Sequence, residues 1–400
     1  MLFPKRLSAG FVPALAVMAI FLTGCLSTTT VTTNEKPTTG EPDKYATGPV
    51  PGSIKEPWRK TAARLSGRGF SAGQLEAVFN SPNLEYTSVP MATKLKELYG
   101  VFFRSDLTKE IQERLYQLGY DILIDGRGGA GTQGTIKRFQ ADNKLAQTGE
   151  ISDKTKGDLA RVMKTKPLRP LSGYKPPQVE KPARASTYAQ FTSPSSLSKI
   201  SENYKRDKAV FQRMSSRYNV PGEVVAAIMW VETRYGEFMG KNKAANQLAS
   251  MSAAAMDFSV VEGAVAELAK DSESRAFLKE NATTRGEWAL DELTALLKYA
   301  FDNGHDPTSF PGSIYGAIGW GQFMPSNVSR FGVDGNGDGR VDIFDKTDAI
   351  FSIGNYLKNH GWHGQNLSEK ERRNVILKYN KSGIYANTVL FVADHLASGK

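Results

Sequence analysis

The 400-residue chain contains a single cysteine, Cys25, so no disulfide can form within it. Disulfides are the usual reason for keeping cysteines in an exported protein, and Cys25 therefore needs another explanation. Histidine is also scarce, and the four that occur have no spacing typical of a metal site: His305, His360, His363 and His395. A disulfide scaffold and a histidine–cysteine metal centre are both disfavoured.

The first 24 residues have the pattern of a secretory signal: a basic start, an apolar run and then small residues. The run is too short to favour a membrane-spanning helix. The stretch LTGC at 22–25 resembles a bacterial lipobox, which implies cleavage before Cys25 and lipidation of that residue. Leu26, in place of an aspartate, implies sorting to the outer membrane. The alternative is an ordinary cleaved signal with an incidental cysteine.

Acidic residues are outnumbered by lysine and arginine, and the formal net charge is +10. Such a chain can bind nucleic acid, an anionic membrane or an acidic polymer. Export disfavours nucleic acid. We therefore expect an envelope surface or a cell-wall polymer as the partner.

Composition divides the remainder into segments. Residues 25–55 are rich in Thr, Pro and Gly without apolar periodicity and are predicted to form a disordered tether, and residues 165–196 a linker. Residues 56–104 have helical patterns, residues 105–164 contain three short ones that predict a small domain, and residues 197–400 form the large domain. The predicted fold is mainly α (α+β at most), with the clearest large-domain helices over 223–233, 286–303, 346–360 and 386–397.

Glu232 is unusual because it lies in the apolar stretch IMWVETRYG. Val224, Ile228 and Glu232 are spaced four apart, so the glutamate extends the buried face of the predicted helix. Desolvation should raise the pKa of its carboxyl and keep it protonated near neutral pH, as a general acid requires. The alternative is a glutamate at the helix end that pairs with Arg234 or Arg213 at the surface.

Four motifs in order carry a family resemblance: VETRYG, GAIGWGQFMPS at 316–326, DGNGDGRVDIFD at 334–345 and YNKSGIYA at 379–386. Together they resemble the membrane-bound lytic murein transglycosylase B family. The resemblance implies a lysozyme-like fold and cleavage of the β-1,4 bond between N-acetylmuramic acid and N-acetylglucosamine in peptidoglycan. It implies Glu232 as the sole acid/base, no catalytic cofactor and 1,6-anhydromuramic acid ends, because the muramyl 6-hydroxyl attacks its own anomeric carbon.

The resemblance also assigns residues to the sugar cleft. Ser313 matches a serine that hydrogen-bonds the catalytic glutamate, and Gln322 matches a glutamine that lines the cleft. Aromatic and amide residues of the same groove match four further positions: Tyr356, Tyr379, Asn380 and Tyr385. Judged by residue type alone, these tyrosines could equally be core aromatics.

The acidic stretch that begins at Asp334 has the oxygen spacing and the central glycine of an EF-hand loop for Ca²⁺. Its twelfth position is Asp345, which is shorter than the usual glutamate. The resemblance implies a longer loop whose last ligand is at position fifteen, so the expected ligands of a structural Ca²⁺ are Asp334, Asn336, Asp338, the Arg340 carbonyl and Asp348. A metal-free turn is the alternative.

Residues from about 106 to 164 resemble the peptidoglycan-binding type 1 domain, and this domain would interrupt the catalytic one. The sequence departs from that pattern at Gly128, where an aromatic residue is usual. The alternative is three-helix packing without a ligand. The predicted protein is thus a lipid-anchored periplasmic enzyme that cleaves peptidoglycan, with other cell-wall enzymes as conceivable partners. A hydrolytic muramidase and a catalytically idle wall-binding lipoprotein remain as rivals.

Overall fold

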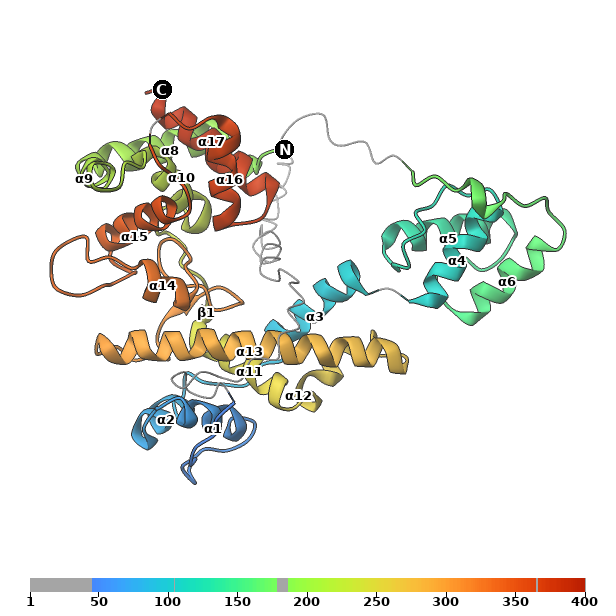
Figure 1. The fold of residues 1–400 in the computed structure, drawn as a ribbon, viewed down its shortest axis with the longest axis horizontal. Helices are drawn as coiled ribbons and strands as arrows, with labels where there is room; N and C mark the ends of the chain where they lie inside the picture. Colours follow the sequence, from blue (N-terminus) through green and yellow to red (C-terminus); the bar gives the residue numbers. More distant parts are fainter. Residues whose placement is uncertain (1–44, 104, 178–185, 365, 400) are drawn as a thin grey trace, which may run out of the picture.

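The structure is a computed structural model that describes residues 45–103, 105–177, 186–364 and 366–399 (Figure 1). The predicted signal segment, Cys25 and most of the predicted tether lie outside the described residues. The expectation of a mainly helical chain is confirmed. The two strands of the described residues are two residues long and pair antiparallel: β1 (Asn242–Lys243) and β2 (Pro311–Gly312).

The helices fall into two groups with separate hydrophobic cores. The small unit, residues 105–174, contains α4 (Asp106–Gln117), α5 (Ala130–Asp142) and α6 (Asp153–Met163), followed by the short 3-10 helix η1 (Leu171–Gly173). The main unit, residues 45–103 and 186–399, contains α1 (Arg59–Gly67), α2 (Ala72–Phe79), α3 (Val89–Phe102), α7 (Ala189–Thr192), α8 (Pro194–Arg206), α9 (Lys208–Tyr218), α10 (Gly222–Thr233), α11 (Ala244–Met256), α12 (Ser259–Glu262) with η2 (Gly263–Val265), α13 (Ser272–Asp302), α14 (Pro325–Phe331), α15 (Lys346–Asn359), α16 (Glu369–Tyr379) and α17 (Gly383–Ala397).

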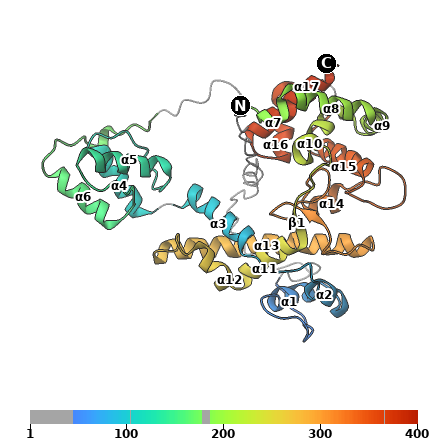
Figure 2. The same cartoon turned by 180° about the vertical axis from the view of Figure 1, so that it is seen from behind.

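The main unit is continuous in space although the small unit interrupts it in sequence. Its core contains Leu65 and Leu95 from before the small unit together with Val225 and Leu293 from after it. The long helix α13 lies between α1 and α2 on one side and α10 and α15–α17 on the other (Figures 1 and 2). Asp271 and Ser274 form a capping box at its start, which satisfies amide groups that the helix itself cannot.

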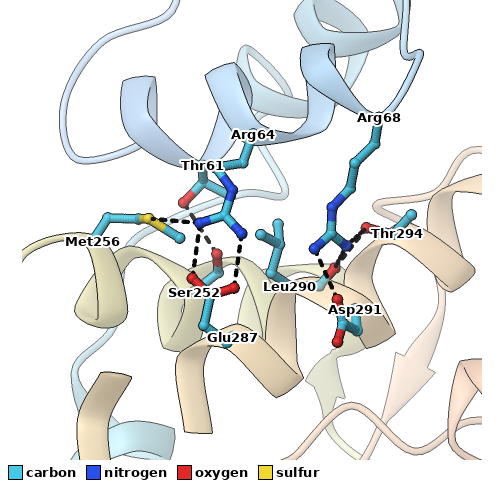
Figure 3. A network of polar contacts seen from close by, with 9 residues as sticks. All are labelled: Thr61, Arg64, Arg68, Ser252, Met256, Glu287, Leu290, Asp291 and Thr294. Carbon is cyan, nitrogen blue, oxygen red and sulfur yellow. Dashed lines mark hydrogen bonds and ion pairs between the residues drawn. The ribbon is translucent and has the colours of Figure 1, made fainter. Parts of the chain in front are cut away.

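Arg64 of α1 and Arg68, which directly follows α1, fasten the N-terminal helices to α13 (Figure 3). The Arg64 guanidinium donates to both carboxylate oxygens of Glu287 at 2.8 Å each. Arg68 donates to Asp291 at 2.8 Å and to the Thr294 hydroxyl at 2.7 Å. Bidentate pairs fix both distance and orientation, so α1 is held in one register on α13.

Two segments that the sequence analysis placed in flexible connections are packed. Residues 45–55 belong to the main unit, because Ile54 is only 1% exposed and the amide of Gly48 donates to the carbonyl of Ala63 at 2.8 Å. Residues 165–174 lie on the small unit, where Tyr174 packs edge-on against Tyr116 with 5.0 Å between ring centroids. Composition does not predict the packing of these two segments, because each is mainly polar and only a few of its side chains anchor it.

Helix α7 and the start of α8 also lie within the predicted linker, so the main unit resumes before residue 197. Ser193 caps α8 and Pro194 occupies its first position, both of which favour a helix start. The predicted helix over 286–303 is likewise too short, because α13 begins at Ser272. Its first turns are rich in polar residues, which hides the apolar periodicity.

No single helix among the described residues is both long and apolar enough to cross a membrane. One bent pair, Ala244–Met256 with Ser259–Val265, meets the criteria of length and composition, with a bend of 116°. Most of α11 is buried in the core of the main unit.

Replacing Arg64 should destabilise the main unit. Arg64→Met keeps the aliphatic stem but leaves the Glu287 carboxylate, whose side chain is 18% exposed, without its partner. Breaking such a pair costs about 3 kcal/mol or more. The control is Lys96→Met, because the Lys96–Glu267 pair is exposed on both sides and is worth at most about 1 kcal/mol. Urea unfolding of the two variants should show a clear loss for the first only, and equal losses would contradict this account of α1.

Candidate active site

Glu232 lies at the penultimate position of α10, just before a sharp reversal of the chain. Arg234, Tyr235 and Gly236 all have positive φ, at 51°, 62° and 87°. Gly236 must be glycine, because a Cβ there would come within 2.4 Å of the Trp320 ring. The reversal ends the helix and leaves Glu232 partly buried at its edge.

The segment 313–324 packs directly on this reversal. The Thr233 hydroxyl donates to the Trp320 carbonyl at 3.0 Å, and the rings of Tyr235 and Trp320 meet edge to face at 5.8 Å. Ile318 forms isolated bridges with Gly312 and Phe323, so the segment folds back on itself. The motifs VETRYG and GAIGWGQF therefore pack together, although residues 237–315 separate them in the sequence.

Three tyrosines surround the Glu232 carboxyl. Tyr379 is the last residue of α16, Tyr385 lies in the first turn of α17, and Tyr188 directly precedes α7. Burial and the nearby Glu232 raise the pKa of all three phenols. They therefore remain neutral near pH 7 and can donate hydrogen bonds without adding charge.

Burial raises the pKa of Glu232 from 4.5 to about 7, opposed only by the Tyr385 hydroxyl. That hydroxyl is buried and meets no strict hydrogen-bond geometry, yet it is near enough to favour the charged carboxylate. No carboxylate of the described residues contributes to the shift. Glu232 is thus a carboxyl whose pKa burial brings close to neutral pH.

The alternative of a surface pair is not observed. Neither Arg234 nor Arg213 forms an ion pair with Glu232 among the described residues, and the Arg213 guanidinium lies over the Phe351 ring instead. The prediction that Glu232 extends the buried face of α10 agrees with this arrangement.

The other predicted cleft residues differ in how closely they approach Glu232. Tyr379 donates its hydroxyl hydrogen to the Gly321 carbonyl at 2.5 Å, and it thereby joins the tyrosine group to segment 313–324. Gln322 has φ +48° and donates to the carbonyls of Gly319 and Met239 at 3.0 and 3.3 Å. These bonds use only the amide nitrogen of its side chain, so the amide oxygen can accept a hydrogen bond from a ligand.

Ser313, Tyr356 and Asn380 form hydrogen bonds to nearby backbone groups. The Ser313 hydroxyl accepts the amides of Tyr315 and Ala317 at 3.2 and 3.0 Å, and within the described residues it forms no hydrogen bond to Glu232. The implied Ser313–Glu232 bond is therefore not observed. Tyr356 is 6% exposed and bonds the Lys378 carbonyl, and Asn380 accepts the amide of Ser382.

Tyr188 was missed by the sequence analysis. It directly follows a Pro- and Lys-rich stretch and was assigned to the linker. The structure ties it to α17, because the Thr388 hydroxyl accepts its amide hydrogen at 2.9 Å. A lone tyrosine beside a low-complexity stretch gives no periodic signal, so only tertiary structure reveals its place.

The acidic loop 334–345 is held by its own carboxylates. Asp334 accepts the amides of Gly337 and Gly339, and Asp338 accepts that of Arg340. Their oxygen chemistry suits Ca²⁺, but the described residues contain no group of three or more acidic, His or Cys side chains arranged to hold a metal. The loop fits the ion in its oxygen chemistry and in the spacing of its residues.

Asp348, the expected last ligand, bonds backbone amides of the acidic loop. It is fully buried, and its two oxygens accept three backbone amides, those of Gly335, Asn336 and Asp342. Burial raises its pKa while these bonds oppose the rise. Asp348 therefore ties the loop to α15 in this structure. Ligation by Asp334, Asn336, Asp338, Arg340 and Asp348 stays a prediction.

Comparison with known proteins agrees with the four motifs. The family model described as Transglycosylase SLT domain matches residues 137–371, and that of the Putative peptidoglycan binding domain matches residues 104–158. The first match covers more than half of the chain, and the chain therefore belongs to the transglycosylase SLT domain family. The two matches overlap at residues that the structure places in the small unit.

One curated relative is the membrane-bound lytic murein transglycosylase B of Escherichia coli, which is 28% identical over 253 residues. That match covers 63% of this chain and 62% of the relative. Among solved structures, the soluble lytic transglycosylase SltB1 of Pseudomonas aeruginosa has a TM-score of 0.44 at 21% identity, covering 67% of this chain and 98% of that one. The Escherichia coli lytic transglycosylase Slt35 in complex with calcium has a TM-score of 0.43 at 21% identity, covering 72% and 98%.

The raised pKa of Glu232 predicts a pH-dependent difference in stability. A pKa raised from 4.5 to about 7 means that folding favours the protonated form. Its contribution is complete below pH 4.5 and is lost as the pH rises through 7. Relative to wild type, Glu232→Gln should therefore gain up to about 3 kcal/mol of unfolding free energy between pH 5 and pH 8.

Urea unfolding at the two pH values measures this difference, with the exposed Glu369→Gln as a control. The control should follow wild type at both pH values. A pH-independent effect of Glu232→Gln would mean that the carboxyl is not desolvated.

Proposed function

We propose that the chain is a lytic transglycosylase that cleaves the β-1,4 bond between N-acetylmuramic acid and N-acetylglucosamine in peptidoglycan and leaves 1,6-anhydromuramic acid ends. The observation that carries the proposal is the lone, desolvated carboxyl of Glu232 among neutral tyrosines. Membership of the transglycosylase SLT domain family supports it.

The geometry supports a single group that acts twice. Protonated Glu232 gives its proton to the glycosidic oxygen as the bond to the anomeric carbon breaks, so the leaving N-acetylglucosamine departs with a hydroxyl. The muramyl 6-hydroxyl then forms a bond to that carbon, and its proton passes to the Glu232 carboxylate. The acid is regenerated without water. An intramolecular nucleophile has a large effective concentration over solvent.

The hydrolytic alternative requires a second group. Glycosidases that use water place two carboxyl groups on either side of the bond, about 5 to 9.5 Å apart. Among the described residues, no carboxylate is a cause of the pKa shift of Glu232. Tyr188, Tyr379 and Tyr385 can donate hydrogen bonds to a sugar but cannot take the place of a carboxylate base near pH 7.

We assign the remaining cleft residues supporting roles. Gln322 would present its amide to the N-acetyl groups, while Tyr379 and Tyr385 form the wall and Ser313 shapes the loop through its backbone bonds. Tyr356 and Asn380 would hold the C-terminal end of α16. The small unit would retain the enzyme on peptidoglycan, in line with its family match.

The proposed location is the periplasmic face of the outer membrane, through a lipid on Cys25. The lipobox-like LTGC supports this proposal. The name of the Escherichia coli relative describes that protein as membrane-bound.

Replacing the acid should abolish cleavage but not binding. Glu232→Gln removes the transferable proton and should lower the rate of anhydromuropeptide release from purified sacculi by about 10³-fold. Mass analysis of the soluble products measures this, and sedimentation with sacculi measures binding. Glu369→Gln is the control and should behave as wild type. Residual full activity in Glu232→Gln would refute the assignment, and products with ordinary reducing ends would favour the hydrolase.

Calcium binding in the loop 334–345 is a separate proposal. An ion would gather carboxylates that otherwise repel one another, and would so stabilise the fold without taking part in the reaction. Calcium should therefore raise the melting temperature of wild type but not of Asp338→Ala. Asp306→Ala serves as control, since Asp306 lies outside the loop and bonds Thr308. A melting temperature of wild type that does not respond to calcium would reject the site.

A further inference from the structure

Asp207 is a buried aspartate that the proposed reaction does not use. It lies between α8 and α9 and is 8% exposed. An aspartate in this position usually caps the following helix with its side chain, but Asp207 makes no such bond. Its carboxylate is directed away from the local backbone, so its partners lie elsewhere in the fold.

Those partners are the reversal after Glu232 and the first residue of α15. One Asp207 oxygen accepts the Tyr235 hydroxyl at 2.9 Å, and the other accepts the Lys346 ammonium at 2.6 Å. Arg206 approaches the same carboxylate at 3.3 Å. These cations keep the pKa of Asp207 below its usual value despite burial, and the carboxylate stays a charged, strong acceptor for Tyr235.

Tyr235 needs such an anchor because of its backbone. It is a non-glycine residue at φ +62°, directly after Arg234 at +51°. Each such residue costs about 1 kcal/mol or more unless its surroundings hold it there. Contacts to its side chain do so: Asp207 accepts the hydroxyl hydrogen, and the Arg206 guanidinium lies 5.9 Å from the centroid of the ring. Trp320, whose ring nitrogen donates to the Phe344 carbonyl at 2.8 Å, packs edge to face against the same ring.

We propose that Asp207 and Tyr235 are positioning residues for the reaction, and that their hydrogen bond locks the reversal that keeps the Glu232 carboxyl aimed into the tyrosine-lined site. This inference rests on the proposed function. Glu232 precedes Tyr235 by only three residues, so any loosening of the reversal changes the direction and the hydration of the carboxyl. The hydrogen bond between Asp207 and Tyr235 would therefore maintain both the orientation of the Glu232 carboxyl and its raised pKa.

The side chains near Glu232 do not change their charge in the pH range in which Glu232 itself titrates. Tyr188 before α7, Tyr379 of α16 and Tyr385 of α17 act on it, and all three stay neutral well above pH 7. No charged side chain of the described residues is among the causes of its pKa shift. A change in the pKa of Glu232 therefore reports its hydration.

A second tyrosine–carboxylate hydrogen bond, at the other end of α10, offers a matched control. Tyr204 donates to the Glu223 carboxylate at 2.9 Å, the same length and type of bond as Tyr235 to Asp207. Glu223 lies in the first turn of α10, at the end opposite Glu232. Tyr204→Phe and Tyr235→Phe remove equivalent bonds, and a general loss of stability would affect both variants alike.

The test compares kinetics and the titration of Glu232 in wild type and the two variants. Tyr235→Phe should lower kcat about tenfold, the equivalent of one hydrogen bond, and leave KM within about twofold. A carbon-13 titration should show a lower pKa of Glu232 in Tyr235→Phe than in wild type, because better hydration favours the charged carboxylate. Tyr204→Phe should retain wild-type kcat and pKa.

Asp207→Leu removes the acceptor from the other side and should shift the pKa in the same direction, since Lys346 is 30% exposed and can turn to solvent. An unchanged Glu232 pKa in both Tyr235→Phe and Asp207→Leu, or equal effects in Tyr204→Phe, would overturn the positioning role. If wild type released no anhydromuropeptides, the proposed function would fail, but the titration would still decide the role of Asp207 and Tyr235.

Discussion

The desolvation of one carboxyl group is the constraint on which this structure depends. Glu232 lies in the otherwise apolar helix α10 and has no ion-pair partner among the described residues, so burial alone raises its pKa to about 7. The phenols near it come from two parts of the chain, Tyr188 before α7 and the neighbouring Tyr379 and Tyr385, and Tyr385 opposes part of this cost. That arrangement provides the proton donor that the proposed intramolecular displacement requires.

Holding this carboxyl in place requires contacts between segments that are far apart in sequence. The reversal at 234–236 is packed by Trp320 and anchored by Asp207, and Tyr379 bonds the carbonyl of Gly321. Helix α13 lies between this assembly and the N-terminal helices α1 and α2 (Figure 1), and Arg64 binds α1 to it. The small unit interrupts this assembly in sequence without entering its core.

Periodicity was enough to predict α10 and the burial of Glu232, because both follow from side-chain spacing along one helix. The resemblance then indicated Tyr379 and Tyr385, which do approach the carboxyl. Neither periodicity nor the resemblance identified Tyr188, because it follows a low-complexity stretch and comes near Glu232 only through tertiary folding. The same limit applies to Ile54, to Tyr174 and to Asp348, whose bonding to three backbone amides depends on how the loop closes.

Cleavage of murein in heavy-oxygen water tests the central claim most directly. If Glu232 is the sole acid/base and the muramyl 6-hydroxyl is the nucleophile, the products will carry anhydro ends and no oxygen from the solvent. Incorporation of labelled oxygen at the new muramyl ends would contradict the account, because water would then be the nucleophile and a second catalytic group would have to activate it.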